Sequence, residues 1–166
     1  RAVAAPAVAA LAPGADPGTL GGGDHEVTIL YTNDFHSAFA PVPAYWLKGS
    51  PRLGGAAYLA SLIERERTVA RTSFLFDSGD MFTGTLSTLT QGEALLEMMT
   101  LLRYDAMGAG NHEFDYGWRV FDKGMLRVPF PVLCCNIRHR GSGLRFTRPY
   151  TIVERNGARL GVSGVI

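Results

Sequence analysis

The chain has 166 residues, of which 46% are hydrophobic and 19% charged, a composition typical of a folded globular domain and not of a disordered segment. Its 16 basic and 15 acidic residues leave a net charge of +1, which argues against nucleic-acid binding driven by bulk charge and against an acidic tail. A chain of this length buries roughly 70% of its unfolded surface and needs no disulfide to fold. We therefore expect the two adjacent cysteines, Cys134 and Cys135, to be small buried thiols.

Residues 1–24 are rich in Ala, Gly and Pro and precede the first predicted element. Two interpretations fit this composition: the tail of an export leader, in which "AVAA" resembles a small-residue cleavage site, or a flexible linker. The apolar stretch at 2–12 is too short to span a bilayer, which takes roughly 20 residues. Ordered structure is expected from residue 25, so residues 25–166 are expected to form the folded part.

Strands and helices are expected to alternate along the folded part. Runs rich in β-branched and aliphatic residues predict strands, and apolar residues at three- and four-residue spacing predict helices. In chain order we expect a strand at 26–34, a loop at 35–54, a helix at 56–71, a strand at 73–80, a helix at 93–103, a strand leading into a glycine loop at 104–113, a short helix at 116–126, and strands at 129–137, 150–154 and 158–166. The short helix should turn Trp118, Phe121 and Met125 inward. The alternation predicts an α/β fold.

Polar residues follow the first predicted strand in the sequence Asn33-Asp34-Phe35-His36. In an extended chain, Asp34 and His36 would point to the same face, because they are two residues apart. A carboxylate and an imidazole on one face provide two ligands of a metal site. This pair is common in proteins and is weak evidence when taken alone.

A second polar cluster, Asp77-Ser78-Gly79-Asp80, follows the next predicted strand. Gly79 permits a tight turn that could hold the Asp80 carboxylate at the edge of the sheet. A carboxylate has two oxygens, so Asp80 could bridge two cations. For Asp77 we expect a structural role in turn formation or helix capping.

The third cluster extends from Gly110 through Asn111, His112, Glu113 and Phe114 to Asp115. Asn111 offers a neutral oxygen ligand, and His112 is suited to moving a proton near neutral pH. Asp115 could orient the His112 ring, cap a helix, or do both. Glu113 is expected to be structural.

Together, Asp-x-His, Gly-Asp and Gly-Asn-His-Glu, each after a strand, form the pattern of the calcineurin-like metallophosphoesterases. Ligands in open α/β sheets gather at the carboxyl ends of strands, which accounts for that order. "ILYTNDFHS", "FDSGDMFTGT", "LRYDAMGAGNHEFDYG" and "FPVLCCNI" resemble the 5′-nucleotidase family, and the likeness extends over residues 26–166. That family includes ecto-5′-nucleotidases and periplasmic UDP-sugar hydrolases, so the resemblance implies an exported protein.

The resemblance implies the N-terminal half of a four-layer α/β/β/α sandwich and a site with two divalent ions, Zn²⁺ or Mn²⁺ rather than Mg²⁺ or Ca²⁺. Carried over by motif, the metal ligands are Asp34, His36, Asp80 (bridging) and Asn111, and the catalytic dyad is His112 with Asp115. Two ions about 3.5–4 Å apart would clamp the phosphoryl group of a nucleotide and activate a water for in-line attack on phosphorus. His112 would stabilise or protonate the leaving oxygen.

The family completes this site with later histidines in Gly-His loops, and nothing in the chain matches them. We expect the two remaining histidines, His25 and His139, to be loop residues and not ligands. The family's separate C-terminal, nucleoside-binding domain is also unmatched. We therefore expect weak metal binding and little catalysis by the chain alone, and an exposed sheet face through which it could dimerise.

Two other functions stay open at this stage. One is a different hydrolase of the same superfamily, acting on a sulfur ester or a cyclic nucleotide. The other is a non-enzymatic binding module on a phosphatase scaffold, against which the intact His112–Asp115 pair argues. The sequence does not choose among AMP, UDP-sugars and cyclic nucleotides as substrates.

Overall fold

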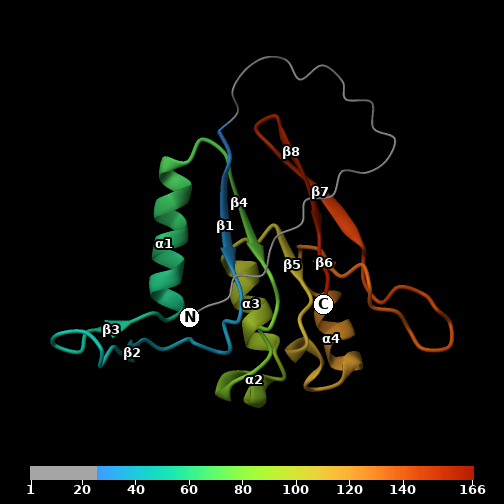
Figure 1. Ribbon diagram of the computed structural model, residues 1–166, viewed down its shortest axis with the longest axis horizontal. Helices are drawn as coiled ribbons and strands as arrows, with labels where there is room; N and C mark the ends of the chain where they lie inside the picture. The colour runs from blue at the N-terminus through green and yellow to red at the C-terminus, as the bar shows by residue number, and fades with distance from the viewer. Residues whose placement is uncertain (1–25) are drawn as a thin grey trace.

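A parallel β-sheet with helices packed on one face forms the centre of the computed structural model, which describes residues 26–166 (Figure 1). The leader or linker expected at 1–24, and His25, lie outside the described residues. The elements are β1 (Thr28–Thr32), β2 (Val42–Pro43), β3 (Arg52–Leu53), α1 (Ala56–Val69), β4 (Ser73–Asp77), α2 (Thr85–Thr90), α3 (Glu93–Leu101), β5 (Ala106–Gly108), the 3₁₀ helix η1 (His112–Phe114), α4 (Trp118–Met125), β6 (Val132–Leu133), β7 (Tyr150–Arg155) and β8 (Ala158–Ser163).

The four strands of the central sheet are in the order β1-β4-β5-β6, and all are parallel. This order is also the chain order, and each crossover between neighbours contains at least one helix. Right-handed crossovers between consecutive neighbours place every helix on the same face. The predicted α/β fold is confirmed, and the sheet brings the carboxyl ends of β1, β4 and β5 to one edge.

The main hydrophobic core lies between the sheet and its helices. Leu75 of β4 and Met107 of β5 point into it and are 1% and 0% exposed. Ile63 of α1, Leu95 of α3 and Phe121 of α4 belong to the same cluster. Each such side chain contributes roughly 1.5–3 kcal/mol when it is fully buried. This core fixes the strands whose ends carry the polar clusters.

The opposite face of the sheet is only partly covered. Phe74 of β4 is 1% exposed, and the guanidinium of Arg155 from β7 lies 5.1 Å from the centre of its ring. At the neighbouring strand β1, Ile29 and Tyr31 are 54% and 64% exposed. An apolar sheet face is therefore exposed at β1, whereas β7 covers part of β4. Dimerisation through this face stays a prediction.

The last two predicted strands are present as β7 and β8. They lie outside the central sheet and pair with each other as an antiparallel hairpin, joined by Asn156 and Gly157 at φ 51° and 82°. The structure differs from the sequence prediction at Trp118 and in three short elements. Trp118, predicted to face inward, is 43% exposed; it is the first residue of α4, and its ring packs against His139 and Phe146. The segment 35–54, predicted as a loop, contains β2 and β3, and α2 was not predicted.

No helix within residues 26–166 combines the length and apolar character needed to cross a membrane.

Candidate metal centre

Three loops meet at the carboxyl edge of the central sheet. They follow β1, β4 and β5, and backbone hydrogen bonds join the first two. The Asp34 N–H donates to the Gly79 carbonyl at 3.1 Å, and the Ser78 N–H donates to the Thr32 carbonyl at 2.9 Å. All three predicted polar clusters therefore lie at one edge, as their positions after the strands indicated.

The first loop does not have the extended backbone assumed from the sequence. Asp34 and His36 have φ angles of 51° and 47°, in the left-handed region that few residues other than glycine adopt. The premise of an extended chain was therefore wrong. The two side chains nevertheless face each other, with 3.7 Å between Asp34 Oδ1 and His36 Nε2, because the turn folds them back over the strand end.

The second and third loops are in direct contact through two glycines. Gly79 has φ 97°, and a Cβ at this position would overlap the backbone nitrogen of Gly110. A Cβ on Gly110 would in turn overlap the Asp80 carboxylate. The absence of both side chains lets Asp80 lie against the third loop.

Gly79→Ala is expected to destabilise the chain more than Gly141→Ala. Both glycines have φ 97°, so both substitutions carry the same backbone penalty of about 1–2 kcal/mol. No atom lies within 4 Å of a Cβ at Gly141, whereas at Gly79 the obstacle is backbone. We expect Gly79→Ala to lower the free energy of unfolding by about 2 kcal/mol more than Gly141→Ala, measured by urea denaturation. Equal losses would show that the contact between the loops relaxes without cost.

A buried carboxylate holds the second and third loops together. Glu113 is 0% exposed and accepts hydrogen bonds from the backbone N–H groups of Asp80 (3.0 Å), Met81 (2.7 Å) and Gly110 (2.6 Å). Burial raises the pKa of Glu113, and the three backbone donors oppose that shift. The structural role expected for Glu113 matches this arrangement.

His112 lies beside both Asp80 and Asp115. Its backbone N–H donates to Asp80 Oδ1 at 3.0 Å, and its Nδ1 is 2.8 Å from Asp115 Oδ2. The hydrogen bond to Asp115 raises the pKa of His112. Because Asp115 engages Nδ1, Nε2 is the ring nitrogen left for another partner. Asp115 follows η1 at its C-terminal end and caps no helix N-terminus, since α4 begins after Gly117.

Among residues 26–166, one group of three potential metal-binding side chains was found: His36, Asp80 and His112. Their ligand atoms lie within 4.8 Å of one another, and the two imidazole rings are 5.3 Å apart at their centres. Asp34 adjoins this group through His36. Asn111 is exposed at the start of η1, and its side chain makes no hydrogen bond to another described residue.

Two imidazoles with carboxylates are a donor set that suits Zn²⁺ or Mn²⁺, so the residues fit the divalent metal ions expected from the sequence. Metallophosphoesterase relatives, described below, imply such ions as well. His139 lies elsewhere, packed against Trp118 and Phe146.

A second buried carboxylate, Asp77, lies behind the loops. It accepts hydrogen bonds from the Thr32 hydroxyl at 2.5 Å and from the Gly79 N–H at 2.7 Å, and Thr32 also contacts the Tyr104 hydroxyl at 2.8 Å. Burial raises the pKa of Asp77 to about 7 and that of Tyr104 to about 12. The sequence predicted a turn-forming role for Asp77 but gave no sign of Thr32 or Tyr104 as partners, because they are distant along the chain.

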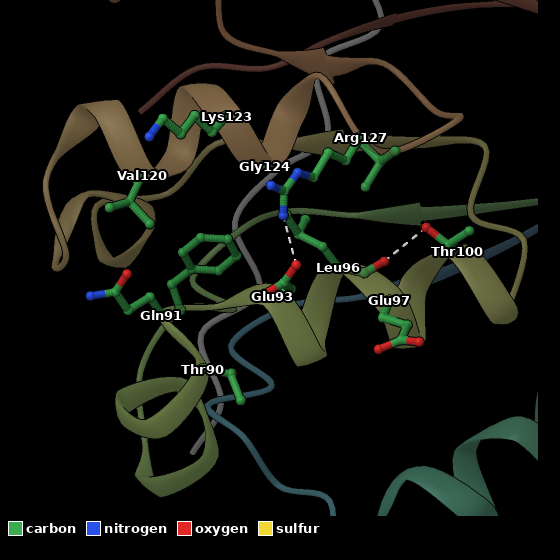
Figure 2. A pocket seen from close by; sticks show the side chains of 12 residues that line it. Thr90, Gln91, Glu93, Leu96, Glu97, Thr100, Val120, Lys123, Gly124 and Arg127 are labelled. Atoms are coloured by element: carbon green, nitrogen blue, oxygen red, sulfur yellow. Dashed lines mark hydrogen bonds and ion pairs between the residues drawn. The ribbon is translucent and has the colours of Figure 1, made fainter.

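One surface hollow is separate from this centre. It has a volume of about 490 Å³ and lies between α3 and α4, where Arg127 pairs with Glu93 at 2.7 Å (Figure 2). None of the predicted metal or catalytic residues lines it. The candidate centre itself is open to solvent on one side, since Asp34 and His36 are exposed.

Comparisons with known proteins give consistent results. The 5′-nucleotidase of Homo sapiens is 35% identical over 175 aligned residues, covering 99% of this chain and 30% of that protein. The snake venom 5′-nucleotidase of Naja atra is 36% identical over 152 residues, covering 86% of this chain and 28% of that protein. The chain thus spans less than a third of the length of these curated relatives. No protein-family model matches the chain.

Solved structures define the class. The 5′-nucleotidase precursor of Thermus thermophilus superposes with a TM-score of 0.76 at 34% identity, over 84% of this chain and 28% of that one. A calcineurin-like phosphoesterase of Bacillus subtilis superposes with a TM-score of 0.62 at 28% identity, over 82% of this chain and 46% of that one. The parallel sheet with polar loops at its carboxyl edge is thus the N-terminal part of a metallophosphoesterase fold. Within that class, the chain belongs to the 5′-nucleotidase family.

Proposed function

We propose that residues 25–166 form part of the catalytic domain of a dinuclear-metal phosphoester hydrolase of the 5′-nucleotidase type. The observation that carries this proposal is the convergence of His36, Asp80 and His112, with ligand atoms within 4.8 Å of one another, beside the His112–Asp115 pair. The names of the relatives add the reaction class. A non-enzymatic module would not require a histidine oriented by a carboxylate at the same edge as the ligands.

The metal ligands proposed are Asp34 and His36 for one ion, Asp80 between two ions, and Asn111 for the second. When bound, divalent ions supply electrostatic stabilisation of the phosphoryl oxygens and lower the pKa of a coordinated water. The chain's own contribution is orientation: the Glu113 carboxylate holds the backbone of Asp80, and the loop after β1 places the Asp34 and His36 side chains 3.7 Å apart. These contacts hold the ligand side chains in place before a metal ion binds, so that less conformational entropy is lost on metal binding.

His112 is proposed to act on the leaving oxygen of the substrate. Asp115 accepts a hydrogen bond from Nδ1, which fixes the ring and favours the protonated imidazole. The raised pKa keeps a larger fraction of His112 charged near neutral pH, so Nε2 can donate a hydrogen bond or a proton to the oxygen that leaves phosphorus. Because His112 is itself close to Asp80 and His36, the leaving group would lie beside the metal ligands.

Asp80→Asn tests the proposal. In calorimetric titrations of the chain with Mn²⁺ or Zn²⁺, we expect this variant to bind at least about tenfold more weakly, since it replaces the bridging carboxylate by a neutral amide. Asp122→Asn is the matched control, because Asp122 lies on α4 outside the cluster. Equal metal affinity of the two variants would contradict the assignment.

The same two variants separate turnover from binding. Release of phosphate from AMP with added Mn²⁺ or Zn²⁺ should be slow, because four ligands shared between two ions leave each under-coordinated, and should disappear in Asp80→Asn only. A UDP-sugar and a cyclic nucleotide assayed at equal concentration identify the preferred substrate. Hydrolysis of a sulfur ester in place of all three would favour the other superfamily activity.

Export of the protein, as in the ecto-enzymes and periplasmic enzymes of the family, is part of the proposal.

A further inference from the structure

An arginine-lined hollow lies at the edge of the sheet where β4 begins, at the other end of this strand from the metal loops. It is open to solvent, has a volume of about 400 Å³, and is lined by Arg67, Ala70, Arg71, Ser73, Arg103, Arg155 and Asn156. We propose that this arginine hollow binds a tetrahedral phosphate oxyanion, free or as a compact monoester. The proposal is independent of the function proposed above.

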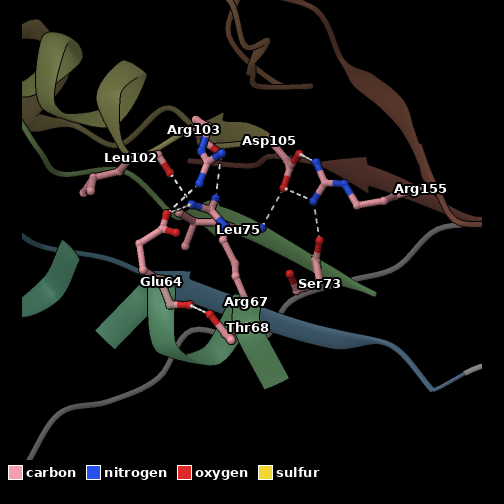
Figure 3. A network of polar contacts seen from close by, with 9 residues as sticks. All are labelled: Glu64, Arg67, Thr68, Ser73, Leu75, Leu102, Arg103, Asp105 and Arg155. Carbon is pink, nitrogen blue, oxygen red and sulfur yellow. Dashed lines mark hydrogen bonds and ion pairs between the residues drawn. The ribbon is translucent and has the colours of Figure 1, made fainter. Parts of the chain in front are cut away.

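Arg67 is fixed at one side of the arginine hollow. Its guanidinium donates to the carbonyls of Leu102 at 2.8 Å and Arg103 at 2.9 Å, where α3 ends (Figure 3). Its side chain is only 15% exposed. The loss of rotamer freedom that usually opposes ligand binding by a long side chain has therefore already occurred on folding.

Arg155 is fixed at the other side. It contacts both oxygens of Asp105, at 2.6 Å and 3.4 Å, and also donates to the Ser73 carbonyl (Figure 3). The next residue, Asn156, donates from Nδ2 to the Arg71 carbonyl at 2.9 Å. The β7–β8 turn is thereby held against the start of β4, and the arginine hollow has a defined shape.

Positive charge exceeds negative charge in this network. The four guanidinium groups face two carboxylates, Asp105 and Glu64; Glu64 lies 2.6 Å from Arg103 and 3.3 Å from Arg67. The hydrogen bond from Arg103 lowers the pKa of Glu64. Two positive charges remain uncompensated by neighbours within residues 26–166.

Arg71 has the greatest capacity for a ligand. It is exposed, and within the described part of the chain its guanidinium makes no hydrogen bond or ion pair. A guanidinium presents five N–H donors in a planar fork that matches two oxygens of a phosphate group. Arg103 uses one of its donors on Glu64, so further donors of Arg103 are available. A phosphate oxyanion satisfies these donors, and the volume leaves room for a small esterified group.

Phosphate titration of metal-free chain tests the proposal, with the metal removed by chelating resin so that the metal centre cannot take up phosphate. Ionic strength is held constant with chloride, and binding is followed by NMR at the Asn156 side-chain amide. Orthophosphate and glycerol phosphate are titrated separately to distinguish free anion from monoester. We expect saturable shifts and about tenfold weaker binding in Arg71→Gln, with partial recovery in Arg71→Lys, which keeps the charge but not the fork.

Arg140→Gln is the matched control. Arg140 is also exposed but lies outside the arginine hollow, and its replacement by glutamine removes the same single positive charge. Its affinity for orthophosphate should equal that of the unmodified chain. Equal weakening by Arg71→Gln and Arg140→Gln would indicate a bulk charge effect and overturn the proposal. Two other results would overturn the proposal. One is that phosphate shifts the Asn156 amide signals no more than chloride does. The other is that Arg71→Gln keeps the same affinity for orthophosphate while its circular dichroism spectrum is unchanged.

Discussion

Glu113→Gln is expected to lower the free energy of unfolding by about 3–5 kcal/mol and to weaken metal binding at the candidate centre. One carboxylate oxygen of Glu113 accepts from Met81, and the other accepts from both Asp80 and Gly110. An amide places an NH₂ group against at least one of these backbone donors, and each buried donor left without an acceptor costs about 1–3 kcal/mol. The NH₂ group itself also lacks a partner there.

The effect on metal binding follows from the position of Asp80. Its backbone N–H is one of the three donors to Glu113, and its Oδ1 accepts from the His112 N–H. Loss of the Glu113 contacts therefore frees the carboxylate proposed to bridge two ions, and we expect Mn²⁺ affinity to fall together with stability. Glu97→Gln is the control, because Glu97 is exposed on α3. The free energy of unfolding is measured by urea denaturation at pH 8. If Glu113→Gln lowers it by less than about 1 kcal/mol, water accepts the backbone hydrogen bonds in place of the carboxylate.

The sequence predicted the sheet and the position of its polar loops well, because both depend on local signals. Strand runs rich in branched aliphatic residues and helices with apolar spacing are patterns within a few residues, and polar residues after parallel strands must meet at one edge. The conformation of the first loop was not predictable in this way. Asp34 and His36 adopt positive φ angles, which residues other than glycine adopt in only a small fraction of cases, so the local sequence did not indicate them.

Contacts across long stretches of the chain could not be predicted from local patterns. The Glu113 carboxylate bonds the backbone of Met81, 32 positions away, and Thr32 joins Asp77 across 45 positions. The hairpin β7–β8 is a different case, since its turn residues, Asn156 and Gly157, are a strong local signal for a two-residue turn. These two residues account for the antiparallel pairing of β7 with β8.

Asp77→Asn is expected to make the chain's stability less dependent on pH. Asp77 has a pKa of about 7 in the folded chain, against 3.8 as the ordinary value, because burial disfavours its charged form. The folded state therefore binds the proton more tightly than the unfolded state. The stabilisation from this difference is fully present below pH 3.8, and is lost as the pH rises through about 7. A shift of this size corresponds to about 4 kcal/mol.

Asparagine reproduces the protonated form of Asp77. Its oxygen can accept from the Gly79 N–H, and its NH₂ group can donate to the Thr32 hydroxyl, whose own hydrogen can turn to Tyr104. We expect Asp77→Asn to match the unmodified chain only below about pH 4, and to exceed it in stability by about 1–2 kcal/mol at pH 5 and by about 4 kcal/mol at pH 8, measured by urea denaturation in metal-free buffer. His112 and Glu113 titrate in both proteins, so the difference between the two stability curves isolates Asp77. Asp122→Asn, on partly exposed α4 surface, is the matched control and should lack the stability gain of Asp77→Asn at pH 8. Parallel stability curves for Asp77→Asn and the unmodified chain would show that Asp77 stays ionised in the folded chain throughout this range.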